Sequence, residues 1–243
     1  MSISLAAEPI IHIGDFPVTN SFVTGVLGTS LVALLFLILT KRKSQLAYFL
    51  IRGFYNFASG IAGEKTREFF PLFFTFFLFI LFGNWIGLLP GVGSIGFFEH
   101  HGEEVKFIPL LRAVTSDLNT TLALALISMS AVQYYGIKHL GLPYFKKFFN
   151  FSSPINGFVG ILELVSEFSK IISYAFRLFG NIFAGEVLLA VMATLIPVLI
   201  PAPFFFMEVF VGFIQAVVFS MLTIVFLNIA TISHGEEVAT HGH

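Results

Sequence analysis

The chain has 243 residues, of which 56% are hydrophobic and 11% are charged, and its mean hydropathy is +0.91. Because soluble domains carry about 25% charged residues, this composition excludes an ordinary soluble enzyme and favours a single membrane-embedded domain over residues 1–243. The formal net charge of −1 does not point to nucleic acid, and the lack of cysteine excludes disulfides and thiol chemistry.

Five apolar segments, each long enough to cross a hydrocarbon core of about 30 Å, follow one another along the chain. They cover residues 20–40, 69–89, 118–137, 158–196 and 204–232. Between the first two, residues 44–66 mix basic and aromatic side chains, which is typical of an amphipathic helix on the membrane surface. The expected fold is therefore an all-α integral membrane protein with five membrane helices and one surface helix.

The distribution of lysine and arginine predicts the orientation, because these residues concentrate in cytoplasmic loops. The stretch 41–68 holds six of them and 138–152 holds three, whereas 90–116 holds two. The chain start has no basic region like that of a cleaved signal peptide, so the first apolar segment is predicted to be a retained anchor. Five crossings then place the N-terminus outside and the C-terminus in the cytoplasm.

The fourth apolar segment is unusually long. As one helix, residues 158–196 would extend about 58 Å at 1.5 Å per residue, well beyond the thickness of the hydrocarbon core. The helix must therefore break or cross the bilayer obliquely. Pro197, Pro201 and Pro203 then mark a turn into the last segment. We expect the last two segments to form a long oblique hairpin.

Polar residues recur within this fourth segment at spacings of three and four, which places them on one helical stripe. They are Glu163, Ser166, Lys170, Ser173, Arg177 and Asn181. Charges inside a bilayer are rare and costly, so Arg177 is a functional hypothesis by default. Its guanidinium cannot lose its proton at ordinary pH, so it is a fixed positive charge rather than a proton carrier.

Two further groups of polar residues complete the pattern. Glu186 lies nine positions beyond Arg177, about 180° around the helix, and so points away from the stripe. On the last helix, Glu208, Gly212 and Gln215 share one face. Polar residues thus approach a permanent cation from both membrane surfaces. This arrangement suits two half-length water paths that do not join.

At these residues the chain resembles a known family. The run RLFGN at 177–181, followed by AGE at 184–186, resembles the signature of subunit a of F-type ATP synthases. The resemblance extends to the segment beginning Gln215-Ala216 and, earlier, to 84–90 and 116–121. It covers roughly residues 65 to 232, and the five-crossing topology agrees with it.

The resemblance implies a non-catalytic stator subunit that needs no cofactor or metal. It would provide two offset half-channels through which protons reach and leave the carboxylates of a rotating ring of c subunits. Its partners would be the c ring, the b subunits of the peripheral stalk, the remainder of the ATP synthase complex and the lipid bilayer, with no nucleic acid. The expected location is a bacterial plasma (inner) membrane.

The resemblance also implies roles for individual residues. Arg177 would attract the ionised ring carboxylate and block direct proton flow between the half-channels. Asn181, Glu186 and Gln215 match external half-channel positions, and the cytoplasmic side is matched by Glu163, Ser166, Lys170 and Ser173. Glu208 departs from the family, since many members pair a histidine there with a glutamate at the position of Glu186, or the reverse. Two nearby carboxylates can share a proton.

Several of these residues also have plainer interpretations. Arg177 can form a structural ion pair inside the bundle, and Lys170 can extend towards the cytoplasmic surface. Glu186 can be a structural hydrogen-bonding residue, and Gln215 can simply join two helices. Glu167 falls off the stripe and is expected to face the surface.

Other polar residues are expected to have structural roles. Asn84 and Asp117 are expected to anchor loops or cap helices, with Asp117 opening the third crossing. The histidines and glutamates of 100–104 are expected to lie in an exposed loop rather than at a metal site.

Two other protein classes remain as alternatives. A self-contained transporter commonly shows internal repeats, and none is found here. A non-conducting scaffold would not need Arg177. Neither class explains the arginine motif, the polar stripe and Gln215 together.

Overall fold

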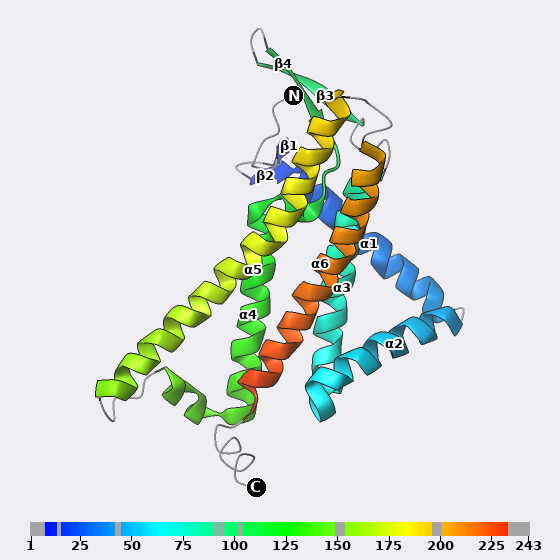
Figure 1. Ribbon diagram of the computed structural model, residues 1–243. Helices are drawn as coiled ribbons and strands as arrows, with labels where there is room; N and C mark the ends of the chain where they lie inside the picture. The colour runs from blue at the N-terminus through cyan, green and yellow to red at the C-terminus, as the bar shows by residue number, and fades with distance from the viewer. Residues whose placement is uncertain are drawn as a thin grey trace.

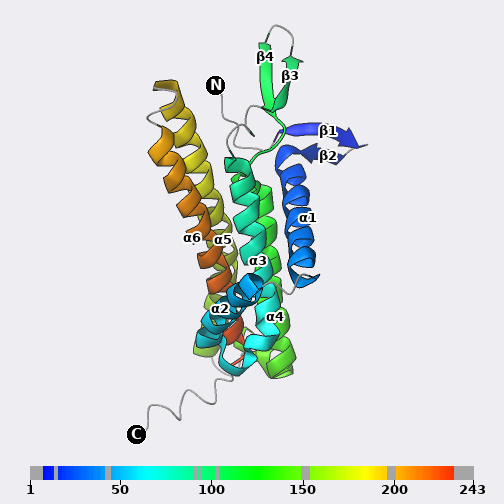
Figure 2. The same ribbon diagram turned by 90° about the vertical axis from the view of Figure 1, so that its right-hand side faces the viewer.

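The computed structural model describes residues 8–13, 16–41, 45–89, 92, 95–101, 104–148, 154–195 and 201–232. Its main elements are helices arranged as a bundle (Figures 1 and 2). They are α1 Asn20–Lys41, α2 Gln45–Ala62, α3 Thr66–Leu88, α4 Leu118–Leu140, α5 Pro154–Leu195 and α6 Pro201–Ala230. The described residues contain five helical stretches long and apolar enough to cross a membrane. The protein is an all-α integral membrane protein, as predicted.

Two small antiparallel hairpins add to this helical architecture. One pairs β1 Pro9–Ile13 with β2 Phe16–Thr19, and the other pairs β3 Gly96–His101 with β4 Glu104–Pro109. Both lie at the same end of the bundle, which we call the hairpin end (Figures 1 and 2). Residues 90–116 were expected to form a loop, and much of this segment is the second hairpin.

Helices α2 and α3 form one apolar stretch, Ala47–Leu88, that changes direction at a short 3₁₀ turn, Gly63–Lys65. Gly63 has a φ of +55°, a conformation that residues with a Cβ rarely adopt. Helix α2 therefore extends outward from the lower end of α3, at a steep angle to it (Figure 1). This geometry suits the predicted surface helix, whose position at the membrane surface stays a prediction.

Helix α5 is a single unbroken helix of 42 residues, about 63 Å long at 1.5 Å per residue. It runs obliquely past α4 (Figure 1), and the expected alternative of a break does not occur. Its oblique crossing of a bilayer stays a prediction. Pro201 begins α6 and Pro203 lies in its first turn, where a missing N–H removes no helical hydrogen bond. Pro197 lies outside the described residues.

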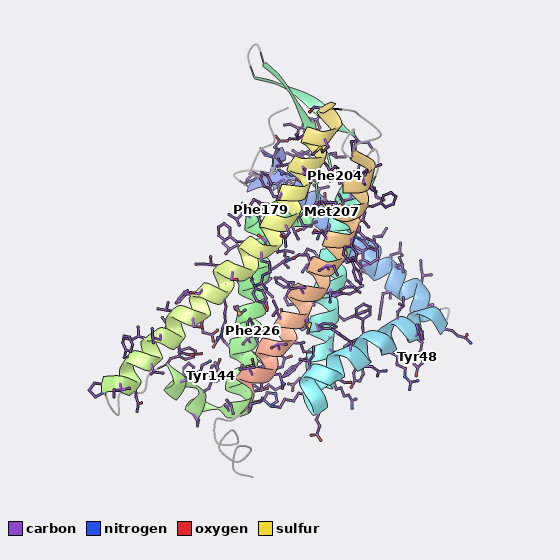
Figure 3. All side chains as sticks on the ribbon, viewed as in Figure 1. Tyr48, Tyr144, Phe179, Phe204, Met207 and Phe226 are labelled. Carbon is purple, nitrogen blue, oxygen red and sulfur yellow. The ribbon has the colours of Figure 1, made fainter. Side chains whose placement is uncertain are left out.

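Aromatic side chains fill the centre of the bundle (Figure 3). Phe219 of α6 lies 5.4 Å, centroid to centroid, from Phe76 of α3 and 5.0 Å from Tyr174 of α5, both edge-on. A hydrogen bond of 2.9 Å between Ser128 and Thr223 joins α4 to α6. Helix α6 is thus held against α3, α4 and α5.

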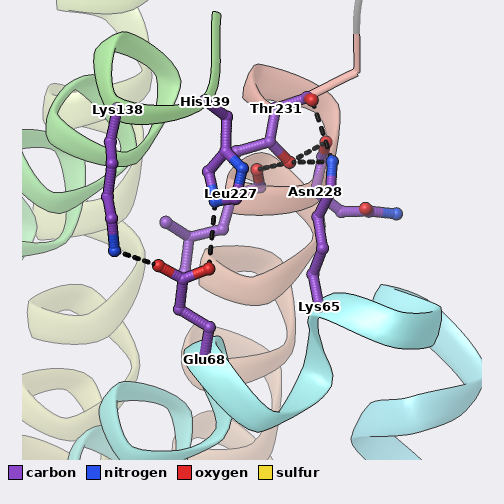
Figure 4. A network of polar contacts seen from close by, with 7 residues as sticks. All are labelled: Lys65, Glu68, Lys138, His139, Leu227, Asn228 and Thr231. Atoms are coloured by element: carbon purple, nitrogen blue, oxygen red, sulfur yellow. Dashed lines mark hydrogen bonds and ion pairs between the residues drawn. The ribbon is translucent and has the colours of Figure 1, made fainter.

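Polar contacts tie the helices together at the end opposite the hairpins (Figure 4). Glu68 of α3 contacts both Lys138 and His139 of α4. Lys65 Nζ donates to the Thr231 carbonyl at 2.8 Å, and Asn228 Nδ2 donates to the Ile61 carbonyl at 2.9 Å. These contacts fasten α3 to α4 and α6, while α5 diverges from α6 towards this end (Figure 1).

Candidate functional site

Arg177 lies near the middle of α5 on the face that the bundle leaves exposed. The opposite face of the same turns is buried, through Tyr174, Ala175, Leu178 and Ile182. Among the described residues, no carboxylate lies within ion-pair distance of Arg177. The described residues therefore do not form the structural ion pair that the plainer interpretation expected for Arg177.

The predicted stripe occupies this same face of α5. Ser166, Ser173 and Asn181 are exposed like the arginine, and Glu163 and Lys170 are half-buried. Because α5 is unbroken, the spacing of three and four residues keeps the whole stripe aligned over several turns.

Asn181 connects the exposed face of α5 to the interior. Its Nδ2 donates to Oε1 of Gln215 at 2.8 Å, and Gln215 on α6 is only 4% exposed. Gln215 does join two helices, as the plainer interpretation held. Its Nε2 is buried without a hydrogen-bond partner in the part of the chain that the structure describes. Buried polar atoms normally have partners, so this amide remains available for a further hydrogen bond.

Glu208, two turns from Gln215 on α6, is almost completely buried, with 1% of its surface exposed. Its carboxylate packs directly against Gly185 of α5, in the space that a Cβ at residue 185 would fill. One carboxylate oxygen, Oε1, has no hydrogen-bond partner among the described residues. Gly212 and Gln215 are also buried, which agrees with the shared face expected for these three residues.

Glu186 contacts Arg112, in the segment that follows the β3–β4 hairpin. Both Nε and Nη2 of the arginine lie 3.0 Å from Glu186 Oε2, and the two side chains are 10% and 20% exposed. Because the Glu208 carboxylate packs against Gly185, and Glu186 is the next residue, the two glutamates lie near each other. The sequence analysis identified both glutamates as candidate site residues but did not identify Arg112.

The loop that carries Arg112 is anchored by buried polar residues of η3, Val114–Ser116, and α4. Thr115 donates to Asn84 Oδ1, and Asp117 accepts from the backbone N–H of Asn119 at 3.1 Å. Asp117 caps α4, as predicted. Asn84 lies inside α3 rather than at its end, so it acts as a loop anchor and not as a cap.

The half of α5 farther from the hairpins carries a second cluster of charges. Glu167 accepts from Gln133 at 3.0 Å, from Lys170 at 2.9 Å and from Lys147 at 3.4 Å, and Lys147 also contacts Glu163. Glu167 was expected to face the surface, and that expectation is wrong. It points into the contact between α4, α5 and η4, Leu142–Lys147, with a side chain only 14% exposed.

Lys170 bends towards α6. Its Nζ lies 5.0 Å from the ring centroid of Phe226, while it donates to Glu167. The lysine therefore belongs to the interface of α4, α5 and α6, and does not simply extend towards the membrane surface.

Comparison with known proteins gives a consistent result. The family model described as "ATP synthase A chain" matches residues 19–228. The chain belongs to this family. It is 41% identical over 175 residues to a protein of Gloeobacter violaceus named "ATP synthase subunit a", covering 72% of this chain and 65% of that protein. A protein of the same name from a Sulfurihydrogenibium species is 35% identical over 174 residues, covering 72% of this chain and 74% of the relative.

Membership of the ATP synthase A chain family confirms the resemblance drawn from the Arg177 motif. It also confirms the interpretation of the chain as a non-catalytic membrane subunit of an ATP synthase. Arg112 and Glu167 are the residues that sequence reasoning missed. The sequence offered only weak signals for them: an arginine just before the polar run 115–117, and two lysines ahead of the fourth segment.

Proposed function

We propose that this chain is the proton-conducting stator subunit of the membrane sector of an ATP synthase. It provides two offset half-channels that pass protons to and from the carboxylates of a rotating c ring. Proton flow is thereby coupled to ring rotation and ATP synthesis. Its further partners are the b subunits of the peripheral stalk, and its location is a bacterial plasma membrane.

The exposed position of Arg177, without a carboxylate partner in the described part of its own chain, carries this proposal. A permanent charge at this depth is costly unless another chain supplies the opposite charge. An ionised carboxylate on the neighbouring ring meets that need as it passes the exposed face of α5. Because arginine keeps its proton, it holds this carboxylate ionised and blocks direct proton transfer between the two half-channels.

The outer half-channel is proposed to run from the hairpin end of the bundle to Arg177. It includes Glu186, Glu208, Gln215 and Asn181, which lie in that order from the hairpin end. The buried polar atoms without protein partners, Glu208 Oε1 and Gln215 Nε2, support a path that water molecules can fill.

The inner half-channel is proposed to follow the exposed stripe of α5 from Arg177 towards its N-terminal end. Ser173, Ser166, Lys170 and Glu163 line it. The end opposite the hairpins then faces the cytoplasm, with the N-terminus outside, the C-terminus inside and α2 at the cytoplasmic surface. The lysines and arginines concentrated at that end support this orientation.

The energy available is adequate for this role. One elementary charge that moves through 100 mV gains about 2.3 kcal/mol. Several protons per turn of the ring can therefore drive ATP formation elsewhere in the complex.

The test is ATP-driven proton pumping in inverted membrane vesicles that contain the complete complex. Arg177→Ala is expected to abolish pumping while the complex still assembles. Arg52→Ala is the matched control, because Arg52 is an exposed arginine on α2 and contacts Tyr48 of the same helix. Pumping at native rates in assembled Arg177→Ala complexes would refute the proposal and reopen the transporter and scaffold alternatives.

A further inference from the structure

We infer that Lys65 and Asn228 hold the last turn of α6 away from α5 and thereby keep the mouth of the inner half-channel open. This inference rests on the proposed function and refines it. Both are positioning residues that act through α6, and neither exchanges a proton. We call the contacts of Lys65 with Thr231 and of Asn228 with Ile61 the α2–α6 latch; Figure 4 shows its Lys65, Asn228 and Thr231.

In the latch, the ends of two helices provide hydrogen bonds for each other. Lys65 Nζ, in the turn after α2, donates to the Thr231 carbonyl at 2.8 Å and to Thr231 Oγ1 at 3.1 Å. Asn228 Nδ2, in the last turn of α6, donates to the Ile61 carbonyl of α2 at 2.9 Å. The last carbonyls of a helix lack partners within it and carry partial negative charge. A cation and an amide donor at these ends therefore stabilise the junction.

The surroundings fix the latch in place. Gly63, with its φ of +55°, turns the chain between α2 and α3, and Lys65 then lies against the end of α6. Thr231 is 4% exposed, and its hydroxyl lies 3.0 Å from the Leu227 carbonyl and 2.9 Å from the Asn228 carbonyl. The side chain of Leu227 is completely buried. The end of α6 is therefore attached firmly to the turn between α2 and α3.

Helix α5 is held by different elements at this end. Its Glu167 accepts from Gln133 of α4 at 3.0 Å and from Lys147 of η4 at 3.4 Å. The carbonyl of Phe148, just after η4, occupies the space that a Cβ at Gly160 of α5 would fill. Helix α5 is thus fixed to α4 and η4, whereas α6 is fixed to the turn after α2. The two helices accordingly diverge towards this end (Figure 1).

Helices α5 and α6 still touch at Lys170 and Phe226. Lys170 Nζ lies 5.0 Å from the ring centroid of Phe226, and the Tyr174 ring lies 5.7 Å from it. Within the next five residues α6 reaches Asn228 and Thr231 of the latch, while α5 continues towards its N-terminal end along the proposed inner half-channel. Because side-chain packing holds membrane helices together, the end of α6 would close against α5 unless it were held elsewhere. The latch supplies that hold.

The experiment uses the complete complex in inverted vesicles, whose outer face is the cytoplasmic one. Ser166→Cys, on the exposed stripe of α5, gives this cysteine-free chain a single thiol, and a water-soluble maleimide added outside labels it at a measurable rate. Lys65→Met in this background is expected to slow labelling by about tenfold, and Asn228→Leu by about fivefold, as the loss of one charged or one neutral hydrogen bond shifts an equilibrium. ATP-driven pumping by the same variants without the cysteine should fall in the same order.

Two matched variants separate the positioning of α6 from a general loosening of this end. Lys65→Arg keeps a charged donor for the Thr231 carbonyl, so labelling and pumping are expected to stay within about twofold of those of the parent. Glu68→Gln weakens the contacts of Glu68 with Lys138 and His139, which join α3 to α4 at the same end of the bundle. It leaves the latch intact, so labelling is again expected to stay within about twofold.

Several outcomes would overturn the inference. One is unchanged or faster labelling in assembled Lys65→Met and Asn228→Leu complexes, and another is an equal slowing by Glu68→Gln. If Lys65→Met does not assemble, the comparison of Asn228→Leu with Glu68→Gln decides. Arg177→Ala is measured in parallel: pumping there refutes the proposed function, whereas loss of pumping there together with either outcome above refutes only the role of the latch.

Discussion

Asn181 and Gln215 join α5 to α6 through a hydrogen bond of 2.8 Å, from Asn181 Nδ2 to Gln215 Oε1, one helical turn from Arg177. Asn181 lies on the exposed face of α5, whereas Gln215 is buried between the helices. The bond therefore connects the surface that carries the arginine to the interior that carries Glu208. The position of α6 and the surroundings of Arg177 depend on each other.

Replacing Gln215 with leucine removes the Oε1 atom that accepts the hydrogen bond from Asn181 Nδ2. The Asn181 amide then loses this partner. We predict a loss of about 1 kcal/mol in stability, since one neutral hydrogen bond is lost. The larger expected effect is on ATP-driven pumping, because the proposed outer path loses a polar group next to Arg177. Asn181→Leu should act on the same bond, so the double variant should be little worse than either single one. Additive losses in pumping would show that the two residues act separately.

Replacing Gly185 with alanine tests the close contact with Glu208. The added Cβ would overlap the Glu208 carboxylate, so either α5 and α6 must separate or the carboxylate must move. We predict a destabilisation of about 1–3 kcal/mol, the usual cost of overpacking, together with loss of pumping. The measurement is thermal unfolding of the solubilised complex alongside the pumping assay.

Gly53→Ala is the matched control for this substitution. Gly53 lies inside α2, and nothing lies within 4 Å of an added Cβ there. Alanine favours a helix over glycine by about 1 kcal/mol, so stability should stay the same or rise. If Gly185→Ala behaves like Gly53→Ala, the packing of Glu208 against α5 is looser than the structure implies.

The helices and the polar stripe could be predicted because they depend on local pattern. Apolar length located the long helices, although they begin or end up to four residues away from the predicted limits, as at Pro154 and Leu140. The spacing from Glu163 to Asn181 determined a shared face as soon as α5 proved unbroken. The excess length of that segment likewise required an oblique crossing.

The partners of the buried charges could not be predicted, because they come from distant parts of the chain. Arg112 and Glu186 are 74 positions apart, and Gln133 and Glu167 are 34 apart. Helical periodicity predicted that Glu167 points away from the stripe on α5. It could not predict that α4 and η4 cover the side of α5 that carries Glu167. The contact of Gly185 with Glu208 likewise depends on how closely α5 approaches α6.

Replacing Glu167 with alanine should loosen the contact between α4 and α5. The carboxylate accepts hydrogen bonds from Gln133, Lys147 and Lys170. Removing the carboxylate takes this acceptor away from three donors that are little exposed. We predict a destabilisation of about 1–3 kcal/mol, measured by thermal unfolding. Glu64→Ala, at an exposed glutamate in the turn before α3, should change stability by no more than about 0.5 kcal/mol. Equal effects of the two substitutions would show that the Glu167 contacts add nothing.

Tyr144 extends the same network beyond the membrane-spanning helices. Its hydroxyl donates to Gln133 Oε1 at 2.7 Å, and Gln133 in turn donates to Glu167. Tyr144 belongs to η4, and its side chain is buried at the end opposite the hairpins (Figure 3). Burial raises the pKa of the Tyr144 hydroxyl from 10.0 to about 12, and the negative charges of Glu167 and Glu163 act in the same direction.

This raised pKa predicts a specific loss of stability at high pH. A group whose pKa is higher in the folded state contributes fully below its unfolded value of 10.0 and loses that contribution as the pH rises through about 12. The native protein should therefore exceed Tyr144→Phe in stability by a constant amount below pH 10.0, about 1 kcal/mol for one hydrogen bond. That difference should shrink between pH 10.0 and about 12, as denaturant unfolding at each pH would show.

An absorbance titration of tyrosinate in the folded proteins, native minus Tyr144→Phe, should place the ionisation of Tyr144 near pH 12. Ionisation near pH 10.0 in that difference would mean that the hydroxyl is neither buried nor bonded to Gln133 as the structure has it.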